Sequence, residues 1–233
     1  MRIAIIGAGS IGATLARKLT ALGHDVTIAN SRGPETLAQL AAETGATPVA
    51  LPDVAIAADV VILALPVGAL HALAGARLTG TVVDAGNYVP GYRDAPIAAL
   101  DDGLVESRWT ERVLGRPVVK AFNTIGAKTL HAPQNTTDRI AAPVAGDDAQ
   151  AKAVVIALLD ELGFDGFDAG GLDDSWRQQP GTPVYTADLP LDAARVALTQ
   201  ADPAQTEAWR RRMAQTQPRA KPGENHGSRS RPS

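Results

Sequence analysis

The sequence predicts an α/β protein with a doubly wound, mostly parallel sheet and a small α/β extension toward its C-terminus. Two observations support this fold class. Short apolar, β-branched runs alternate with helical segments along most of the 233 residues, and a glycine-rich turn joins the first run to the first helix. Strands that alternate with helices pair in parallel through right-handed crossovers, so the pattern favours a sheet covered on both faces.

The first strand, glycine turn, helix and second strand are expected at residues 3–6, 7–12, 12–22 and 26–29. Gly7 permits a sharp turn, Gly9 lets a phosphate approach the backbone, and Gly12 lets the helix pack on the strand. The helix N-terminus offers free N–H groups and a partial positive charge. A G-x-G-x-x-G in this context predicts a Rossmann-type dinucleotide site at Gly7, Ala8, Gly9, Ser10 and Ile11.

The end of the second strand indicates which dinucleotide binds. A site for NAD usually has an acidic residue here that binds the ribose hydroxyls. This chain has Asn30, Ser31 and Arg32 instead, and a hydroxyl and a guanidinium suit a 2′-phosphate. We therefore predict NADP as the cofactor, with NADPH preferred over NADH; the alternative is that Arg32 is a solvated loop charge.

The alternation continues through the middle of the chain. We expect helices at 34–44, 53–58, 67–73, 107–114 and 126–131, strands at 47–50, 60–65, 81–85 and 117–122, and loops at 86–103 and 132–140. Pro34 suits a first helical position, Gly45 suits a left-handed helix end, and Ser107 suits a helix cap.

A smaller α/β region follows, with strands at 143–146 and 164–169 around a helix at 147–162. Residues 173–190 are polar and are expected to form an ordered irregular loop, with helices at 191–200 and 203–215 after it. We thus predict an NADP-binding domain at 1–142, a small substrate or dimer region at 143–217 and a disordered tail at 218–233.

Ligands of doubly wound sheets bind beyond the carboxyl ends of the strands. The residues that follow the later strands are therefore also predicted to contact the cofactor: Leu65, Pro66, Ala85, Asn87, Phe122, Asn123 and Thr124. Asn123 and Thr124 are expected near the nicotinamide, where an amide or hydroxyl bonds a carboxamide or a substrate carbonyl. The alternative is that both residues only cap their loop.

Composition narrows the function further. The chain is 45% hydrophobic and 20% charged, has a net charge of −3 and contains no cysteine. Thiolate catalysis and cysteine-ligated metals are excluded, and a general attraction to nucleic acid is not implied. The chain has no apolar run of membrane-spanning length and no room for a signal peptide before the first strand, so we expect a cytoplasmic protein without membrane or nucleic-acid partners.

Five stretches together resemble a known family: Gly7–Gly12, Asn30–Glu35, Leu65–Pro66, Val118–Thr124 and Ala145–Asp148. The chain resembles the NADPH-dependent coenzyme F-420 reductases and, more distantly, the cytosolic domain of the six-transmembrane metalloreductases. The resemblance spans residues 1 to about 170. It implies that the first three stretches bind NADP, that 122–124 borders the nicotinamide, and that the protein is a homodimer.

The acceptor of the hydride stays open at this point. The loop at 172–185 departs from the deazaflavin-binding pattern of the family, and Trp176, Arg177 and Tyr185 either contact substrate or serve packing. No side chain suggests itself as a catalytic acid, since no tyrosine has a lysine four residues on, and no metal site is expected. We predict hydride transfer to a deazaflavin or flavin; the alternatives are reduction of a small imine, carbonyl or chelated metal, and a non-catalytic NADPH-binding sensor.

Overall fold

The computed structural model describes residues 1–55, 57–133 and 137–215. The predicted disordered tail at 218–233 therefore lies outside the described residues. The elements of the larger, N-terminal part are β1 (Arg2–Ile6), α1 (Ser10–Ala21), β2 (Asp25–Ala29), η1 (Pro34–Leu37), α2 (Ala38–Thr44), β3 (Thr47–Pro48), η2 (Leu51–Asp53), β4 (Val60–Leu63), η3 (Val67–Leu73), β5 (Thr81–Asp84), α3 (Ala98–Asp101), α4 (Glu106–Leu114), β6 (Val119–Lys120) and α5 (Ala127–His131), where η marks a 3-10 helix.

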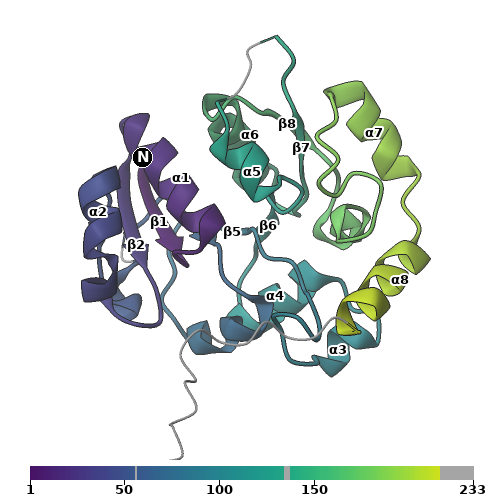
Figure 1. The fold of residues 1–233 in the computed structure, drawn as a ribbon, viewed down its shortest axis with the longest axis horizontal. Helices are drawn as coiled ribbons and strands as arrows, with labels where there is room; N and C mark the ends of the chain where they lie inside the picture. The colour runs from purple at the N-terminus through teal and green to yellow at the C-terminus, as the bar shows by residue number, and fades with distance from the viewer. Residues whose placement is uncertain (56, 134–136, 216–233) are drawn as a thin grey trace, which may run out of the picture.

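The strands of this part form one parallel sheet in the order β3-β2-β1-β4-β5-β6, which confirms the predicted doubly wound α/β class (Figure 1). After β3 the chain crosses to the other side of β1 and continues with β4. The order of the strands thus reverses between β1 and β4, and a crevice at such a switch point is where open α/β sheets bind ligands.

Both faces of the sheet are buried. Ile3 and Ile5 of β1 belong to one apolar cluster, which also contains Leu15 and Leu19 of α1, whereas Ala4 and Ile6 point into a second cluster on the other face. This alternation follows from the two-residue period of a strand. Strands covered on both faces are mostly apolar, which is why residues 3–6 of β1 and all of β4 form continuous hydrophobic runs.

A smaller unit completes the described chain. It consists of β7 (Ala141–Val144), α6 (Ala149–Glu161), β8 (Asp165–Asp168), η4 (Leu172–Gln178), α7 (Leu191–Thr199) and α8 (Pro203–Ala214). Strands β7 and β8 pair in parallel, and α6 connects them. Lys120 of β6 and Ala145 after β7 exchange two backbone hydrogen bonds, of 2.8 and 3.0 Å, so the two sheets are joined through the main chain.

Several predicted elements differ from those observed. The loops expected at 86–103 and 173–190 contain the short helices α3 and η4, and residues 67–73 form a 3-10 helix. Ser107 does not cap α4, which already begins at Glu106; its hydroxyl donates to Asp84 Oδ2 at 2.8 Å. The position of Ser107 in the sequence is typical of a helix cap, but its hydroxyl bonds the buried Asp84 carboxylate of β5 instead.

Arg108 of α4 connects the two parts of the molecule. Its guanidinium contacts Asp173 of η4 at 2.7 Å, Asp147 at 2.8 Å and Glu111 of its own helix at 2.8 Å. A hydrogen bond from the Leu172 backbone N–H, together with Arg108, lowers the pKa of Asp147, and the Arg108 hydrogen bond lowers the pKa of Asp173. The cluster therefore fastens the start of η4 to α4.

These lowered pKa values predict how stability depends on pH. A carboxyl whose pKa is lower in the folded state stabilises the protein above its ordinary pKa and loses that effect as the pH falls through the folded value. We expect Arg108→Met to lower the urea midpoint at pH 7, with a difference from wild type that shrinks below about pH 4. Urea unfolding at several pH values tests this, with the exposed Arg112→Met on the same helix as control. A difference independent of pH would contradict the assignment.

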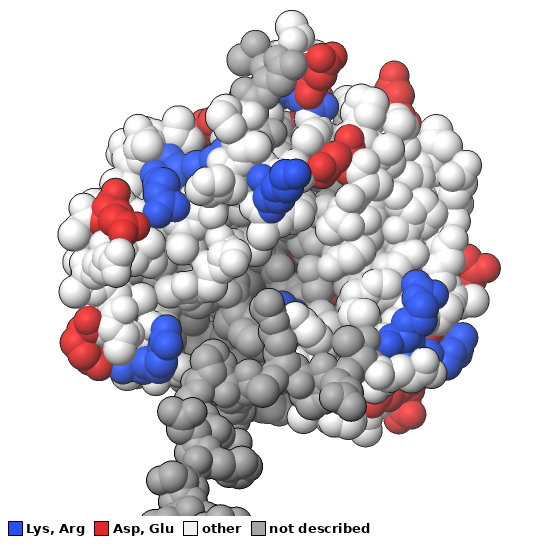
Figure 2. All heavy atoms as spheres, in the orientation of Figure 1, with Lys and Arg blue, Asp and Glu red and all other residues white. Residues whose placement is uncertain are grey.

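Acidic and basic side chains lie interspersed over the face of the molecule shown in Figure 2. None of the helices in the described part of the chain has both the length and the apolar run needed to cross a bilayer.

Candidate functional site

A cavity of about 470 Å³ lies at the carboxyl ends of β1, β2 and β4, beside the switch point of the sheet. It is lined by Ile6, Gly7, Ala8, Gly9, Asn30, Ser31, Arg32, Leu51, Ala64, Leu65, Pro66, Ala69, Ala72 and Leu73. The structure thus brings together the residues predicted from the glycine turn, from the end of the second strand and from the end of β4. Ser10 and Ile11 follow directly, in the first turn of α1.

The three glycines of the turn are required for different reasons. Gly7 has a φ of +113°, and a Cβ there would lie 2.2 Å from the Ala64 carbonyl oxygen. A Cβ on Gly12 would lie 1.8 Å from the Gly7 oxygen, so Gly12 allows α1 to pack against the turn. A Cβ on Gly9 would meet no protein atom within 4 Å, and its backbone conformation is open to any residue. Neither packing nor strain explains Gly9, which fits a backbone approached by a ligand.

The N-terminus of α1 adjoins this cavity without a side-chain cap. Gly9 is the N-cap, no side chain accepts a hydrogen bond there, and the first turn has no acidic residue. The first backbone N–H groups of a helix have no partner inside the helix, and they carry the positive end of its dipole. The arrangement suits a bound anion such as a pyrophosphate.

The loop after β2 is built by Asn30. Its Oδ1 accepts from the Arg32 backbone N–H at 2.9 Å, and its Nδ2 donates to Thr36 Oγ1 at 2.9 Å. Both ends of the amide therefore shape the loop that presents the next two residues. Ser31 and Arg32 are exposed, and no carboxylate among the described residues pairs with the Arg32 guanidinium.

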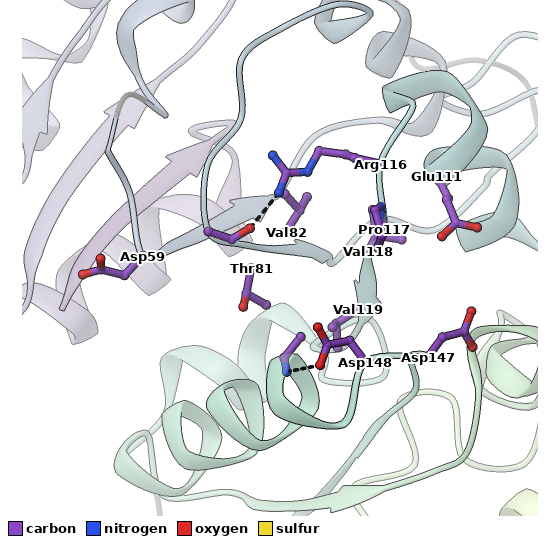
Figure 3. A pocket seen from close by; sticks show the side chains of 12 residues that line it. Asp59, Thr81, Val82, Glu111, Arg116, Pro117, Val118, Val119, Asp147 and Asp148 are labelled. Carbon is purple, nitrogen blue, oxygen red and sulfur yellow. Dashed lines mark hydrogen bonds between the residues drawn. The ribbon is translucent and has the colours of Figure 1, made fainter.

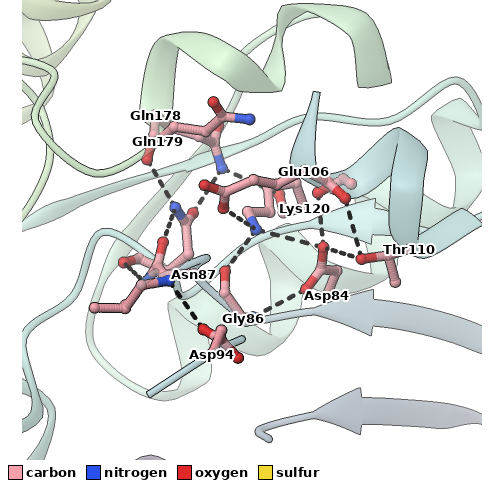
Figure 4. Close-up of polar contacts among 12 residues, drawn as sticks. Asp84, Gly86, Asn87, Asp94, Glu106, Thr110, Lys120, Gln178 and Gln179 are labelled. Carbon is pink, nitrogen blue, oxygen red and sulfur yellow. Dashed lines mark hydrogen bonds and ion pairs between the residues drawn. The ribbon is translucent and has the colours of Figure 1, made fainter. Parts of the chain in front are cut away.

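The predicted residues beyond β5 and β6 do not line this cavity. Asn87 and Asn123 instead bond to each other: Asn87 Nδ2 donates to the Asn123 carbonyl oxygen at 3.0 Å, and Asn123 Nδ2 donates to Asn87 Oδ1 at 3.1 Å. Gln178 of η4 completes the set (Figure 4). Asn123 Nδ2 donates to the Gln178 carbonyl oxygen at 2.7 Å, and Gln178 Nε2 donates to Asn123 Oδ1 at 3.0 Å. The Asn123 amide is thus fully used within the protein.

The C-terminal unit also covers the rest of this loop. The Thr186 backbone N–H donates to the Thr124 carbonyl oxygen at 2.9 Å, and Asn123 and Thr124 are only 4% and 5% exposed. The Thr124 hydroxyl has no hydrogen-bond partner among the described residues. Phe122 is buried with a φ of +65°, a conformation that costs a bulky residue about 1–3 kcal/mol and that concentrates at functional loops. Ala85 is partly buried next to this region.

A buried group of charges supports the loop between β5 and α3 (Figure 4). Lys120 is fully buried; its Nζ donates to the Gly86 carbonyl oxygen at 2.6 Å and lies 3.4 Å from Asp84 Oδ2 and 3.9 Å from Glu106 Oε2. Arg210 of α8 reaches Glu106 Oε1 at 3.1 Å. Burial raises the pKa of Glu106 despite the two cations beside it. Lys120 lies two residues before Phe122, and the sequence analysis predicted no separate role for it.

The aromatic residues of the C-terminal loop have partners in the protein. The Arg177 guanidinium lies 4.6 Å from the centre of the Trp176 ring, and Tyr185 packs edge-on against Trp209 of α8 at 6.1 Å.

Tyr88, in the loop after β5, is buried, donates to Asp101 and accepts from the Ile97 N–H, and burial raises its pKa to about 12. These contacts give each residue a packing role.

A second cavity, of about 540 Å³, opens at the opposite edge of the sheet, where β5 and β6 begin (Figure 3). Arg116 there donates to the Gly80 carbonyl oxygen at 2.8 Å. The carboxylates in its wall are already engaged: Asp59 pairs with Arg2, Glu111 and Asp147 pair with Arg108, and Asp148 caps α6. Four carboxylates around one arginine do not suit a nucleotide.

Comparison with known proteins agrees with this geometry. The profile of the family described as NADP oxidoreductase, coenzyme F420-dependent, matches residues 2–88. The protein YjhV of Escherichia coli (strain K12) is 38% identical over 73 residues, which is 31% of this chain and 48% of that protein, so the chain spans about half the length of this curated relative.

Two solved structures are similar over most of their length. The hypothetical protein SMa0349 from Sinorhizobium meliloti is 34% identical, with a TM-score of 0.73 over 82% of this chain and 96% of that one. A candidate F420-dependent NADP reductase from Arthrobacter sp. FB24 is 28% identical, with a TM-score of 0.59 over 86% of this chain and 90% of that one. The chain is therefore a member of the family of the Sinorhizobium protein, and over residues 2–88 it belongs to the F420-dependent NADP oxidoreductases.

Proposed function

We propose that the protein is an NADP(H)-dependent oxidoreductase that binds its coenzyme in the cavity between β1, β2 and β4. The observation that carries the proposal is Gly9, whose missing side chain serves neither the backbone nor the packing of the protein. Next to it, the uncapped N-terminus of α1 would bind the pyrophosphate. The apolar residues Leu51, Ala69, Ala72 and Leu73 would form the wall of the adenosine subsite.

Arg32 supports NADP rather than NAD. Arg32 lines the cavity, is exposed and has no carboxylate partner among the described residues, and its backbone N–H is held by Asn30. A guanidinium in this position binds a 2′-phosphate with charge-assisted hydrogen bonds, and the cavity wall has no acidic residue to repel that phosphate.

We expect Arg32→Ala to weaken the binding of NADPH by about tenfold to a hundredfold and to leave the binding of NADH nearly unchanged, because only the 2′-phosphate loses a partner. Calorimetric titration of both coenzymes measures the two affinities. Arg112→Ala, at an exposed arginine of α4 outside the cavity, is the control. Equal losses for NADPH and NADH would contradict the role of Arg32.

For the hydride acceptor we propose a flat conjugated ring of the deazaflavin or flavin type. The bound coenzyme supplies the hydride, and the protein needs only to position the two rings and exclude water. Two candidate acids already have other partners: Tyr88 is buried, donates to Asp101 and has a raised pKa, and His71 packs edge-on against Trp109. No acid for protonating a carbonyl or imine stands out among the described residues.

The acceptor can be tested by following the loss of the near-ultraviolet absorbance of NADPH with coenzyme F-420, FMN, FAD and a ferric chelate in parallel. Turnover with coenzyme F-420 or a flavin, abolished by loss of NADPH binding, supports the proposal. Turnover with the chelate alone would assign a metal reductase. Binding of NADPH without turnover of any acceptor would favour the second candidate function below.

That second candidate is a non-catalytic NADPH-binding sensor, and one observation favours it. Gln178 saturates the Asn123 amide and, with Thr186, covers the end of β6, where an acceptor would have to approach the nicotinamide. Gln178→Ala separates the two functions. In a reductase whose acceptor displaces Gln178, this variant should turn over at least as fast as wild type, whereas in a sensor it stays inactive.

A further inference from the structure

The loop after β2 depends on a hydroxyl that does not itself line the proposed coenzyme cavity. Asn30, Ser31 and Arg32 line that cavity, whereas Thr36, in η1, does not. The Thr36 hydroxyl donates to the Gly33 carbonyl oxygen at 2.8 Å and accepts from Asn30 Nδ2 at 2.9 Å. Thr36 therefore connects the start of η1 to the residue that begins the loop.

The directions of these hydrogen bonds allow only one arrangement. A carbonyl oxygen only accepts, so the single proton of the Thr36 hydroxyl is used on Gly33, and the hydroxyl oxygen is left to accept. The amino group of Asn30 must then face Thr36, which turns Asn30 Oδ1 toward the Arg32 backbone N–H, a group that only donates. The three bonds form a chain from Gly33 through Thr36 and Asn30 to Arg32, and each fixes the orientation of the next.

This chain of hydrogen bonds holds a turn that belongs to no strand or helix. Gly33, directly after Arg32, has a φ of +98°, and the Arg32 side chain is exposed. The only carboxylate of residues 30–36, that of Glu35, is also exposed, lies beside the Gly33 backbone and does not line the cavity. In such a turn, side-chain-to-backbone hydrogen bonds decide where the chain directs its side chains.

We propose that Thr36 is a positioning residue that sets the preference for NADPH over NADH. The inference rests on the proposed coenzyme site, in which only a coenzyme with a 2′-phosphate uses the Arg32 guanidinium. The Thr36 hydroxyl acts on that coenzyme through the Asn30 amide and the Arg32 backbone. Charge-assisted hydrogen bonds to phosphate depend on geometry, so an arginine whose backbone is no longer held binds the phosphate less tightly.

Thr36→Val is the test, because valine keeps the branched shape and removes only the hydroxyl. We expect it to weaken the binding of NADPH by about three- to tenfold, the loss of about one net hydrogen bond, and to change the affinity for NADH by less than about twofold. Thr36→Ser keeps the hydroxyl and should bind NADPH like wild type. Calorimetric titration of the full chain with both coenzymes measures these affinities.

Thr199→Val of α7 is the matched control. Thr199 Oγ1 also donates to a carbonyl oxygen three residues earlier, that of Val196, but it does not line the cavity, so this variant should bind both coenzymes like wild type. Wild-type affinity for NADPH in Thr36→Val, an equal loss for NADH, or an equal loss in Thr36→Ser would overturn the role of the Thr36 hydroxyl.

A double-mutant cycle separates positioning from direct contact with the coenzyme. If Thr36 acts through Arg32, the double variant Arg32→Ala/Thr36→Val should bind NADPH about as tightly as Arg32→Ala alone, whereas losses that simply add would overturn the proposal.

The same titrations show whether the inference or the coenzyme site has failed. Wild type that binds neither coenzyme, or Arg32→Ala that keeps the preference for NADPH, would remove the proposed site and this inference with it. A preference that Arg32→Ala abolishes and Thr36→Val leaves intact would overturn the inference alone.

Discussion

Replacing Lys120 by methionine is expected to lower the free energy of unfolding by about 3–5 kcal/mol. Lys120 is fully buried between Asp84 and Glu106, and methionine has a similar length but no charge. The substitution would leave two buried carboxylates with one fewer cation, and burial already raises the pKa of Glu106. Removing one partner from a buried ionic group costs far more than the group contributes to net stability, because the remaining charge is left uncompensated.

Urea unfolding of Lys120→Met and wild type measures this loss, with Lys128→Met on the exposed face of α5 as control. The Gly86 carbonyl oxygen also loses its donor, so we expect a looser loop between β5 and α3 and faster amide exchange at Gly86 and Asn87. A loss below about 1 kcal/mol would show that neighbouring side chains or water compensate the two carboxylates.

The second large effect is on stability, and it is expected at Gly12 but not at Gly9, three residues before it. Gly12→Ala should destabilise the protein severely, because its Cβ would lie 1.8 Å from the Gly7 oxygen and α1 would have to move away from the turn. Gly9→Ser should leave the stability unchanged or slightly higher, because no protein atom lies within 4 Å of its Cβ and serine is a favourable N-cap.

Although Gly9→Ser should be stable, we expect it to lose most of its affinity for the coenzyme. In Gly9→Ser the new side chain would stand where the pyrophosphate approaches the helix, so we expect the affinity for NADPH to fall at least about a hundredfold while the Tm is retained. Thermal unfolding and calorimetric titration of both variants are the measurements. Normal NADPH binding by Gly9→Ser would exclude the pyrophosphate from the N-terminus of α1 and with it the proposed site.

The glycine turn could be predicted from sequence because its signals are local. Glycine is required by local contacts or backbone angles, within a few residues or on an adjacent strand, at Gly7, at Gly12 and at the left-handed helix ends Gly23 and Gly45. The doubly wound parallel class followed from the same local alternation, since parallel strands joined by helices have few arrangements open to them.

The region beyond β6 could not be predicted in the same way. The partner of Asn123 is Gln178, which lies 55 positions later in the sequence in a segment without a regular pattern. Ser107 has the sequence position of a cap, yet its hydroxyl bonds Asp84 on a strand 23 positions earlier. The apolar residues Leu51, Ala69, Ala72 and Leu73 of the proposed coenzyme cavity have no chemical signature that distinguishes them from the core. In each case contacts with residues distant in the sequence determine the role of the residue, and the neighbouring sequence does not indicate them.

The pair of backbone bonds between Lys120 and Ala145 limits how the molecule can move. Enzymes that open by swinging two lobes apart need a flexible joint between them, but here a β-bridge of two backbone hydrogen bonds connects the two sheets. We therefore expect access to the buried end of β6 to come from local rearrangement of η4 and its side chains. Where a conformational step limits turnover, substitutions in η4 should change its rate, whereas substitutions beside the Lys120–Ala145 bridge should not.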